Sequence, residues 1–206
     1  MYQTAKQSAS PMRRNQMSGG VRRALFLSVL FMLSMIPCRL IAQSASDEYQ
    51  IKAAFLFHFA QLVEWPKGAP TDAGPSIKLC VFNDDSRREQ IQSVIEGKAI
   101  GARILRVHAI SQPLQVQACD ILFLSRDQIQ RQAGILRSIR GMGILTVGET
   151  PGFLSDGGMI RFHIDNDKIR FDINLEAAES SHLQISSRLL LLATSVTGKS
   201  ATDRER

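Results

Sequence analysis

Residues 159–193 constrain the fold of this 206-residue chain more than any other stretch. They begin with two short runs in which apolar and polar residues alternate, as in β-strands with one buried face. A two-residue turn at 166–167, on an Asn and an Asp that tolerate positive φ, would place Phe162 opposite Phe171. A slip of one residue would turn an apolar row toward solvent, so the pattern fixes the register. The resulting hairpin has one dry face that must pack against another part of the chain.

Residues 1–44 have the organisation of an export signal. An Arg-Arg pair at 22–23 precedes an apolar run at 24–37, which has the length of a signal-peptide core and is short for a membrane span. Small residues at 42–45 favour cleavage there. We therefore expect residues 1–44 to be a signal peptide and the mature protein to be exported. An uncleaved membrane anchor is the alternative.

The net charge of +6 comes from this leader. Residues 1–44 contain six of the 25 Lys and Arg residues and no acidic residue, so the remaining 19 basic residues balance the 19 acidic ones. A mature chain without net charge gives no basis for a nucleic-acid partner.

The mature chain alternates short apolar segments with amphipathic ones. Strands are expected at 77–82, 104–110, 120–124 and 144–147, and helices at 48–65, 84–96 and 126–140. Short apolar strands between helices indicate parallel βαβ units with helices on both faces of the sheet. We therefore predict one α/β domain over residues 45–198, with a mostly parallel central sheet flanked by helices, a C-terminal antiparallel hairpin and a terminal helix. Residues 199–206 are expected to be a disordered tail.

Removal of the leader would leave two cysteines, Cys80 and Cys119. Disulfides persist in exported proteins, which favours a bridge between them. The alternative is a pair of buried free cysteines, which behave as small apolar residues. Their spacing does not fit a CxxC thiol-exchange catalyst.

Motifs of catalysis are missing from the sequence. It has no GxSxG elbow, no HExxH motif and no Walker-type phosphate loop. The Gly-Met-Gly at 141–143 precedes a strand instead of following one, which is the wrong context for a dinucleotide site. The four histidines are scattered, without the spacing of metal ligands. We therefore expect no catalytic site, no metal and no cofactor.

Two neighbouring features could bind a small molecule. The loop at 149–158 follows the fourth strand, at the edge where open α/β sheets bind ligands, and its glycine-flanked amides could hold an anion. On the polar face of the hairpin, Arg161 would pair with Asp172, and His163 would lie beside Arg170. The alternatives are a turn-rich connection and an ordinary cross-strand ion pair. The candidate ligand site comprises Glu149, Ser155, Arg161, His163 and Arg170.

The predicted terminal helix carries leucine on two sides. The expected inward stripe is Ile185, Leu189, Leu192 and Val196. Leu191 falls on the opposite side and Leu190 lies between. Such a helix is either enclosed within the fold or presents leucine to a partner protein. The candidate partner site comprises Leu189, Leu190, Leu191 and Leu192.

Six segments between about residues 48 and 193 carry a resemblance to a known family. They are EYQIKAAFLFHFAQLVEWP, IKLCVFN, CDILFLS, GILTVGE, GGMIRFHIDNDKIRFDINLEAAE and ISSRLLLLA. In this order they resemble the YfiR-like family of exported bacterial proteins.

The resemblance implies a non-catalytic periplasmic protein that represses an inner-membrane diguanylate cyclase and thereby lowers cyclic-di-GMP synthesis and biofilm formation. It implies an outer-membrane lipoprotein as a second partner, and a homodimer. It also implies a bridge between Cys80 and Cys119, since the family has cysteines at these positions, and a role in repression for the C-terminal leucines. The alternative function is a periplasmic binding protein for a small anion or nucleotide, through the loop at 149–158.

Overall fold

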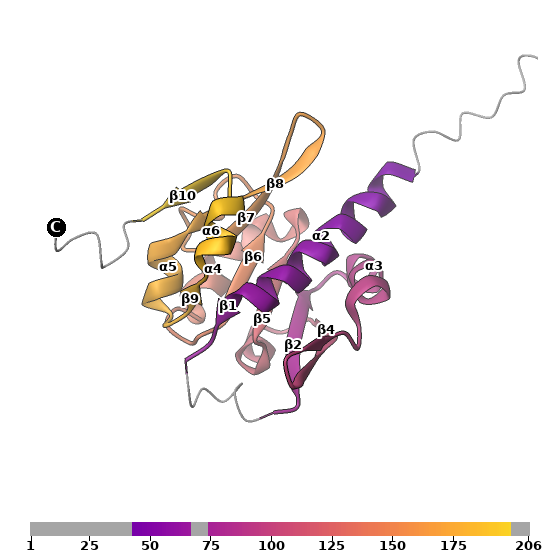
Figure 1. The fold of residues 1–206 in the computed structure, drawn as a ribbon, viewed down its shortest axis with the longest axis horizontal. Helices are drawn as coiled ribbons and strands as arrows, with labels where there is room; N and C mark the ends of the chain where they lie inside the picture. Colours follow the sequence, from indigo (N-terminus) through magenta and orange to yellow (C-terminus); the bar gives the residue numbers. More distant parts are fainter. Residues whose placement is uncertain (1–42, 67–73, 199–206) are drawn as a thin grey trace, which may run out of the picture. The chain divides into compact units, whose positions relative to one another are not determined.

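Eight strands form the central sheet, and five of them are parallel (Figure 1). The computed structural model describes residues 43–66 and 74–198. The strands are β2 (Ser76–Phe82), β3 (Ala99–Ile100), β4 (Arg103–Ile110), β5 (Ile121–Leu124), β6 (Leu145–Gly148), β7 (Ile160–Asp165), β8 (Lys168–Asn174) and β10 (Ser195–Thr197). Their order is β10-β8-β7-β6-β5-β2-β4-β3. The α/β class, the mostly parallel sheet and the C-terminal antiparallel hairpin are thus confirmed.

Helices cover both faces of this sheet, and each face has its own apolar core. The helices are α2 (Gln43–Leu62), α3 (Asp85–Ile95), α4 (Ile129–Ser138), α5 (Leu175–Ser180) and α6 (Ser187–Leu192), with 3-10 turns η1 (Pro113–Ala118) and η2 (Arg126–Gln128). Successive side chains of β2 show the division, because Leu79 faces the core under α2 and α3 while Cys80 faces the core under η1 and α4. A two-stranded ribbon of β1 (Val63–Glu64) and β9 (Gln184–Ile185) joins the end of α2 to the C-terminal part of the domain.

The hairpin β7–β8 has the predicted register. Phe162 pairs with Phe171, and the turn residues Asn166 and Asp167 have φ values of 48° and 58°. The dry face of the hairpin packs on α2, where the ring of Phe59 lies 5.0 Å from that of Phe171 and 5.6 Å from that of Phe162. Helix α2 is therefore the element against which the hairpin buries its apolar row.

The predicted terminal helix is wrong at both ends, because Ile185 lies in β9 and the helix does not continue beyond Leu192. Helix α6 ends at this residue, and the chain continues into β10, which pairs in parallel with β8. Residues 194–197 are Thr, Ser, Val and Thr, and β-branched side chains favour a strand over a helix. Two residues expected to point inward are consequently outside: Leu192 is 63% exposed and Val196 is 42% exposed.

The predicted signal peptide and tail, residues 1–44 and 199–206, lie outside the described residues, except for the first two residues of α2. Within 43–66 and 74–198, none of the helices has the length and apolarity required for a membrane span.

Cys80 and Cys119 form a disulfide. The first lies within β2 and the second precedes β5, which is the strand beside β2 in the sheet. Their Cα atoms are 5.9 Å apart, and both side chains are buried. The bridge therefore joins two neighbouring strands from inside the core under α4.

Reduction of this bridge is expected to lower the free energy of unfolding by about 3 kcal/mol, because a cross-link between residues 39 positions apart restricts the unfolded chain. Chemical denaturation with and without reductant measures the change, and a C80A/C119A variant should not respond to the reductant. Labelling of two thiols in the denatured, unreduced protein would contradict the bridge.

Candidate functional site

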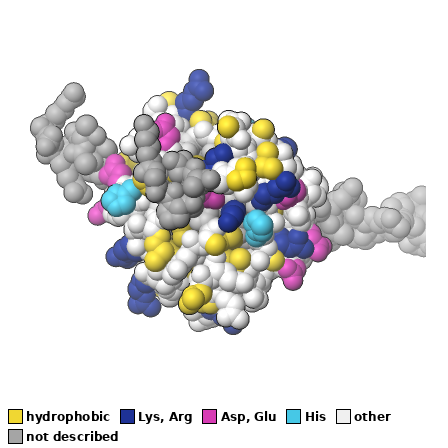
Figure 2. All heavy atoms as spheres, turned by 90° about the horizontal axis from the view of Figure 1, so that it is seen from below, with side chains coloured by type: hydrophobic (Ala, Val, Ile, Leu, Met, Phe, Trp, Pro, Cys, Tyr) yellow, Lys and Arg dark blue, Asp and Glu magenta, His cyan; other side chains and the backbone are white. Residues whose placement is uncertain are grey.

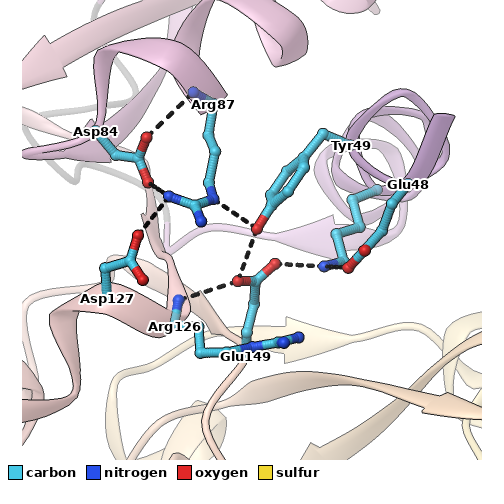
Figure 3. A network of polar contacts seen from close by, with 8 residues as sticks. Glu48, Tyr49, Asp84, Arg87, Arg126, Asp127 and Glu149 are labelled. Atoms are coloured by element: carbon cyan, nitrogen blue, oxygen red, sulfur yellow. Dashed lines mark hydrogen bonds and ion pairs between the residues drawn. The ribbon is translucent and has the colours of Figure 1, made fainter. Parts of the chain in front are cut away.

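The carboxyl ends of the parallel strands are the first place to seek a site. Taken in chain order, the five parallel strands are arranged 2-1-3-4-5 across the sheet, and the order reverses between β2 and β5. Open α/β sheets bind their ligands in the crevice at such a reversal. In this protein a network of polar side chains lies at this edge, beside the ends of β2, β5 and β6 (Figure 3). Its members are Glu48, Tyr49, Lys52, Asp84, Arg87, Asp127 and Glu149, together with the backbone amide of Arg126.

Glu149, which directly follows β6, is the centre of the network. Its Oε1 accepts a hydrogen bond of 2.5 Å from Lys52 Nζ. Its Oε2 accepts bonds of 3.0 Å from the Tyr49 hydroxyl and from the Arg126 amide. That amide begins the helical turn leading into α4, a position that attracts anions. The carboxylate of Glu149 thus takes the place that an anionic ligand would need.

Lys52 neutralises this buried carboxylate from α2. Its side chain is only 2% exposed, and its ammonium group also forms an ion pair with Glu48, one helical turn earlier. The ammonium lies 4.5 Å from the centre of the Tyr49 ring. Helix α2 is therefore attached to the carboxyl edge of the sheet by charge as well as by its aromatic side chains.

Arg87 of α3 extends the network to the loops after β2 and β5. Its Nε donates to the Tyr49 hydroxyl at 2.7 Å, and its Nη1 forms ion pairs with Asp84 and, at 2.6 Å, with Asp127. Burial lowers the pKa of Arg87, but its hydrogen bonds to these partners outweigh burial and raise it. Burial, followed by the charge of Glu149, raises the pKa of Tyr49. The guanidinium therefore stays charged and the phenol protonated, and the network holds together.

The loop at 149–158 is filled by one of its own side chains. Phe153 is fully buried, and a Cβ atom at either Gly148 or Gly158 would lie 2.2 Å from its ring. Ser155 is exposed, and its hydroxyl donates to Gly152 O at 2.8 Å. The glycines around this loop therefore make room for Phe153.

The polar face of the hairpin has the expected pairing, Arg161 with Asp172 and His163 with Arg170. Arg161 Nη2 lies 2.5 Å from Asp172 Oδ2, and His163 Nδ1 lies 3.2 Å from the same oxygen, without the alignment of a hydrogen bond. Both side chains thus turn toward Asp172. Arg170 instead lines a groove beside α2.

The structure does not gather the five predicted ligand residues into one set of contacts. Glu149 belongs to the network at the sheet edge, Ser155 to its own loop, and Arg161 and His163 to Asp172. No hydrogen bond or ion pair joins any two of the five, all of which lie in the described part of the chain. A shared ligand site remains a prediction.

Asp172 is 5% exposed and has a third partner, Ser195 of β10, whose hydroxyl donates to Oδ1 at 2.8 Å. Burial raises the pKa of Asp172. Hydrogen bonds from Ser195 and Arg161, aided by the charges of His163 and Arg161, outweigh burial and bring it below the usual value.

The lowered pKa of Asp172 determines how the stability of the fold changes with pH. The stability that comes from ionised Asp172 is fully present above the pKa of an unfolded aspartate and is lost as the pH falls through the lower folded value. We expect the free energy of unfolding to fall between about pH 5 and about pH 2, and to fall less steeply in Asp172→Asn. Denaturation across this range measures both slopes. Equal slopes would contradict the role of Asp172.

The four leucines of the candidate partner site differ in exposure. Leu189 is buried at 1% and Leu190 is half-buried, whereas Leu191 is 85% exposed. With Leu192, two adjacent leucines project from the end of α6. On the face drawn in Figure 2, hydrophobic side chains form several separate groups among polar atoms.

A comparison with protein families covers most of this domain. The family model described as YfiR/HmsC-like matches residues 49–194, which include every strand of the central sheet except β10. The chain belongs to the YfiR/HmsC-like family. Membership suggests a regulator of cyclic-di-GMP signalling and not an enzyme.

Two solved structures resemble parts of this YfiR/HmsC-like protein. A conserved domain protein from Vibrio cholerae O1 biovar El Tor is 12% identical, with a TM-score of 0.49 over 72% of this chain and 60% of that one. The ABC domain in complex with L-Trp from Streptococcus pneumoniae is also 12% identical, with a TM-score of 0.42 over 59% of this chain and 55% of that one. The chain therefore spans 55–60% of these two proteins, and the likeness carries no functional argument.

Sequence reasoning missed the members of the network that lie on α2 and α3. Lys52 stands in the otherwise apolar run QIKAAFLF, and Glu48 precedes it by four residues, the spacing of a helical ion pair. The spacing of these two residues was a detectable sign of an ion pair on α2. For Arg87 the sequence shows only the nearby Asp84, three residues earlier, because its other partners Tyr49 and Asp127 come from distant segments.

Proposed function

We propose that this protein is an exported, non-catalytic regulator that binds an inner-membrane diguanylate cyclase from the periplasm and represses it, which lowers cyclic-di-GMP synthesis. Membership in the YfiR/HmsC-like family supports the link to cyclic-di-GMP. The structural observation that supports the binding mode is the exposure of Leu191 at the end of α6. We further propose an outer-membrane lipoprotein as a competing partner, and a homodimer.

The exposed leucines can supply the energy that such repression needs. Burying a leucine side chain contributes about 2 kcal/mol, so burying both Leu191 and Leu192 contributes on the order of 4 kcal/mol. A regulator shifts its partner between two states only by the difference between its affinities for them, and strong repression needs a few kcal/mol. Leucines that are buried only against the inactive cyclase would provide a difference of this size.

The sheet edge supports the non-catalytic part of the proposal. At the edge where α/β enzymes bind ligands, Glu149, Lys52 and Arg87 are each paired with other groups of the network. These groups attach α2 and α3 to the sheet. Their role is therefore to stabilise the domain that presents α6.

Deletion of the gene tests the proposal in the cell. We expect cellular cyclic-di-GMP to rise on deletion and to return to its original level when the full-length gene is restored. Affinity capture from solubilised inner membranes, with the mature protein as bait, should recover a diguanylate cyclase. Unchanged cyclic-di-GMP in the deletion strain would overturn the proposal.

The alternative function, a periplasmic binding protein for a small anion or nucleotide, has weaker support. The loop at 149–158 would form its site, yet Phe153 fills this loop and Glu149 is engaged by Lys52. A ligand that binds only the folded protein raises its melting temperature. A thermal-shift panel of phosphate, nucleotides and small carboxylates therefore tests this alternative.

A further inference from the structure

The two halves of the segment that carries the exposed leucines are attached to the domain in different ways. We call residues 187–197, which comprise α6 and β10, the docking segment. In its first half Leu189 is buried, and Leu190 and Ala193 pack partly against the core, whereas all three side chains of β10 are exposed. Apolar burial therefore does little to fix β10, and its polar contacts with β8 become decisive for this half of the segment.

Three hydrogen bonds join the C-terminal half of the docking segment to β8, besides the ladder itself. Thr194 N donates to Phe171 O at 2.8 Å, and Thr197 Oγ1 donates to Ile173 O at 3.3 Å. The third runs from Ser195 Oγ to Asp172 Oδ1 at 2.8 Å. Of the three, this is the bond whose acceptor is ionised, and such bonds are shorter and roughly twice as strong as neutral ones.

The carboxylate of Asp172 is kept ionised by the side chains that contact its second oxygen. Its Oδ2 lies 2.5 Å from Arg161 Nη2 and 3.2 Å from His163 Nδ1, while Oδ1 remains for Ser195. Arg161 also donates to Pro151 O at 2.9 Å, which fixes the guanidinium in place. One buried carboxylate thus connects Arg161 and His163 of the hairpin to the docking segment.

We propose that Asp172 is a positioning residue that acts through Ser195 to hold the docking segment on β8 and so fixes where Leu191 is presented to the partner. This inference rests on the proposed function, because it assigns a way of positioning the surface that the proposed function uses. It adds that repression depends on the hydrogen bond between Ser195 and Asp172, two residues that do not themselves touch the partner.

Substitution of Ser195 tests the contact without disturbing the core, because the residue is exposed. In Ser195→Ala we expect amide hydrogen exchange of residues 194–197 to accelerate about tenfold, since a bond to a charged acceptor is lost, while β2, β5 and β6 keep their protection. Ser195→Thr retains the hydroxyl and should restore slow exchange. The matched control is Ser187→Ala, an exposed serine of the same segment. Equal exchange in the two alanine variants would overturn the inference.

Binding then separates this inference from the proposed function. The measurement is the affinity of the purified mature protein for right-side-out inner-membrane vesicles from the same bacterium. We expect Ser195→Ala to weaken binding several-fold, and Ser195→Thr and Ser187→Ala to bind like the original protein. If Leu191→Asp abolishes binding while Ser195→Ala binds normally, the positioning role is wrong and the proposed function stands. If the unmodified protein does not bind, the proposed function fails and this inference fails with it.

Discussion

A Lys52→Met variant is expected to lose about 4 kcal/mol of unfolding free energy. Lys52 and Glu149 are both buried, and the ammonium group is the nearest cation to a carboxylate that water does not reach. Methionine keeps most of the unbranched side chain but removes the charge, so Glu149 would stay buried with only the hydroxyl of Tyr49 and the amide of Arg126 as donors. Removal of one partner of a buried ion pair is costly because the other charge remains uncompensated. Chemical denaturation measures the loss.

The double variant Lys52→Met/Glu149→Gln is the matched control. A neutral amide can still accept from the Tyr49 hydroxyl and the Arg126 amide through its oxygen, so no buried charge is left alone. We therefore expect the double variant to recover much of the stability that the single variant loses. If both variants lose the same amount, or if Lys52→Met loses less than about 1 kcal/mol, the ion pair is not what holds α2 on the sheet edge.

Leu191→Asp is expected to weaken binding to inner-membrane vesicles at least about 30-fold and to leave the domain folded. Leu191 is 85% exposed, so an aspartate there meets water in the free protein and should change the unfolding midpoint little. In the complex the same carboxylate would be transferred to an apolar contact without a partner, which is unfavourable. Equilibrium binding to right-side-out vesicles and thermal unfolding measure the two effects separately.

The chain offers a close control in Leu114, which is 82% exposed but lies on η1, under the opposite face of the sheet from α2. Leu114→Asp makes the same chemical change at nearly the same exposure. We expect it to bind vesicles like the original protein. Equal loss of binding in both variants would show a general effect of added negative charge. Unfolding of Leu191→Asp alone would show that this side chain supports the fold.

The local sequence pattern was sufficient to predict the structure where the residues that contact each other lie close together in the sequence. The alternation around Phe162 and Phe171 determined the register of the hairpin, because a two-residue turn allows no other pairing that keeps both rings buried. The α/β class followed in the same way from short apolar strands between helices. The leucine run at 189–192 also predicted a helix correctly.

Long-range contacts explain what the sequence did not reveal. Lys52 is buried because Glu149, 97 residues later, lies at the end of β6, and a lone lysine in an apolar helix would otherwise be expected to face water. The change from helix to strand after Leu192 depends on the free edge of β8, which receives β10. The pairing of Arg161 with Asp172 was predicted from the hairpin register, but the approach of His163 to the same carboxylate was not, because it depends on how the side chains turn within the folded sheet.

The most direct test of the central claim is cellular cyclic-di-GMP in a deletion strain that carries the original gene, Leu191→Asp or Leu114→Asp, with equal amounts of folded protein in the periplasm. We expect the original gene and Leu114→Asp to restore the low level, and Leu191→Asp to leave it as high as in the strain without the gene. Full restoration by Leu191→Asp would contradict docking through α6.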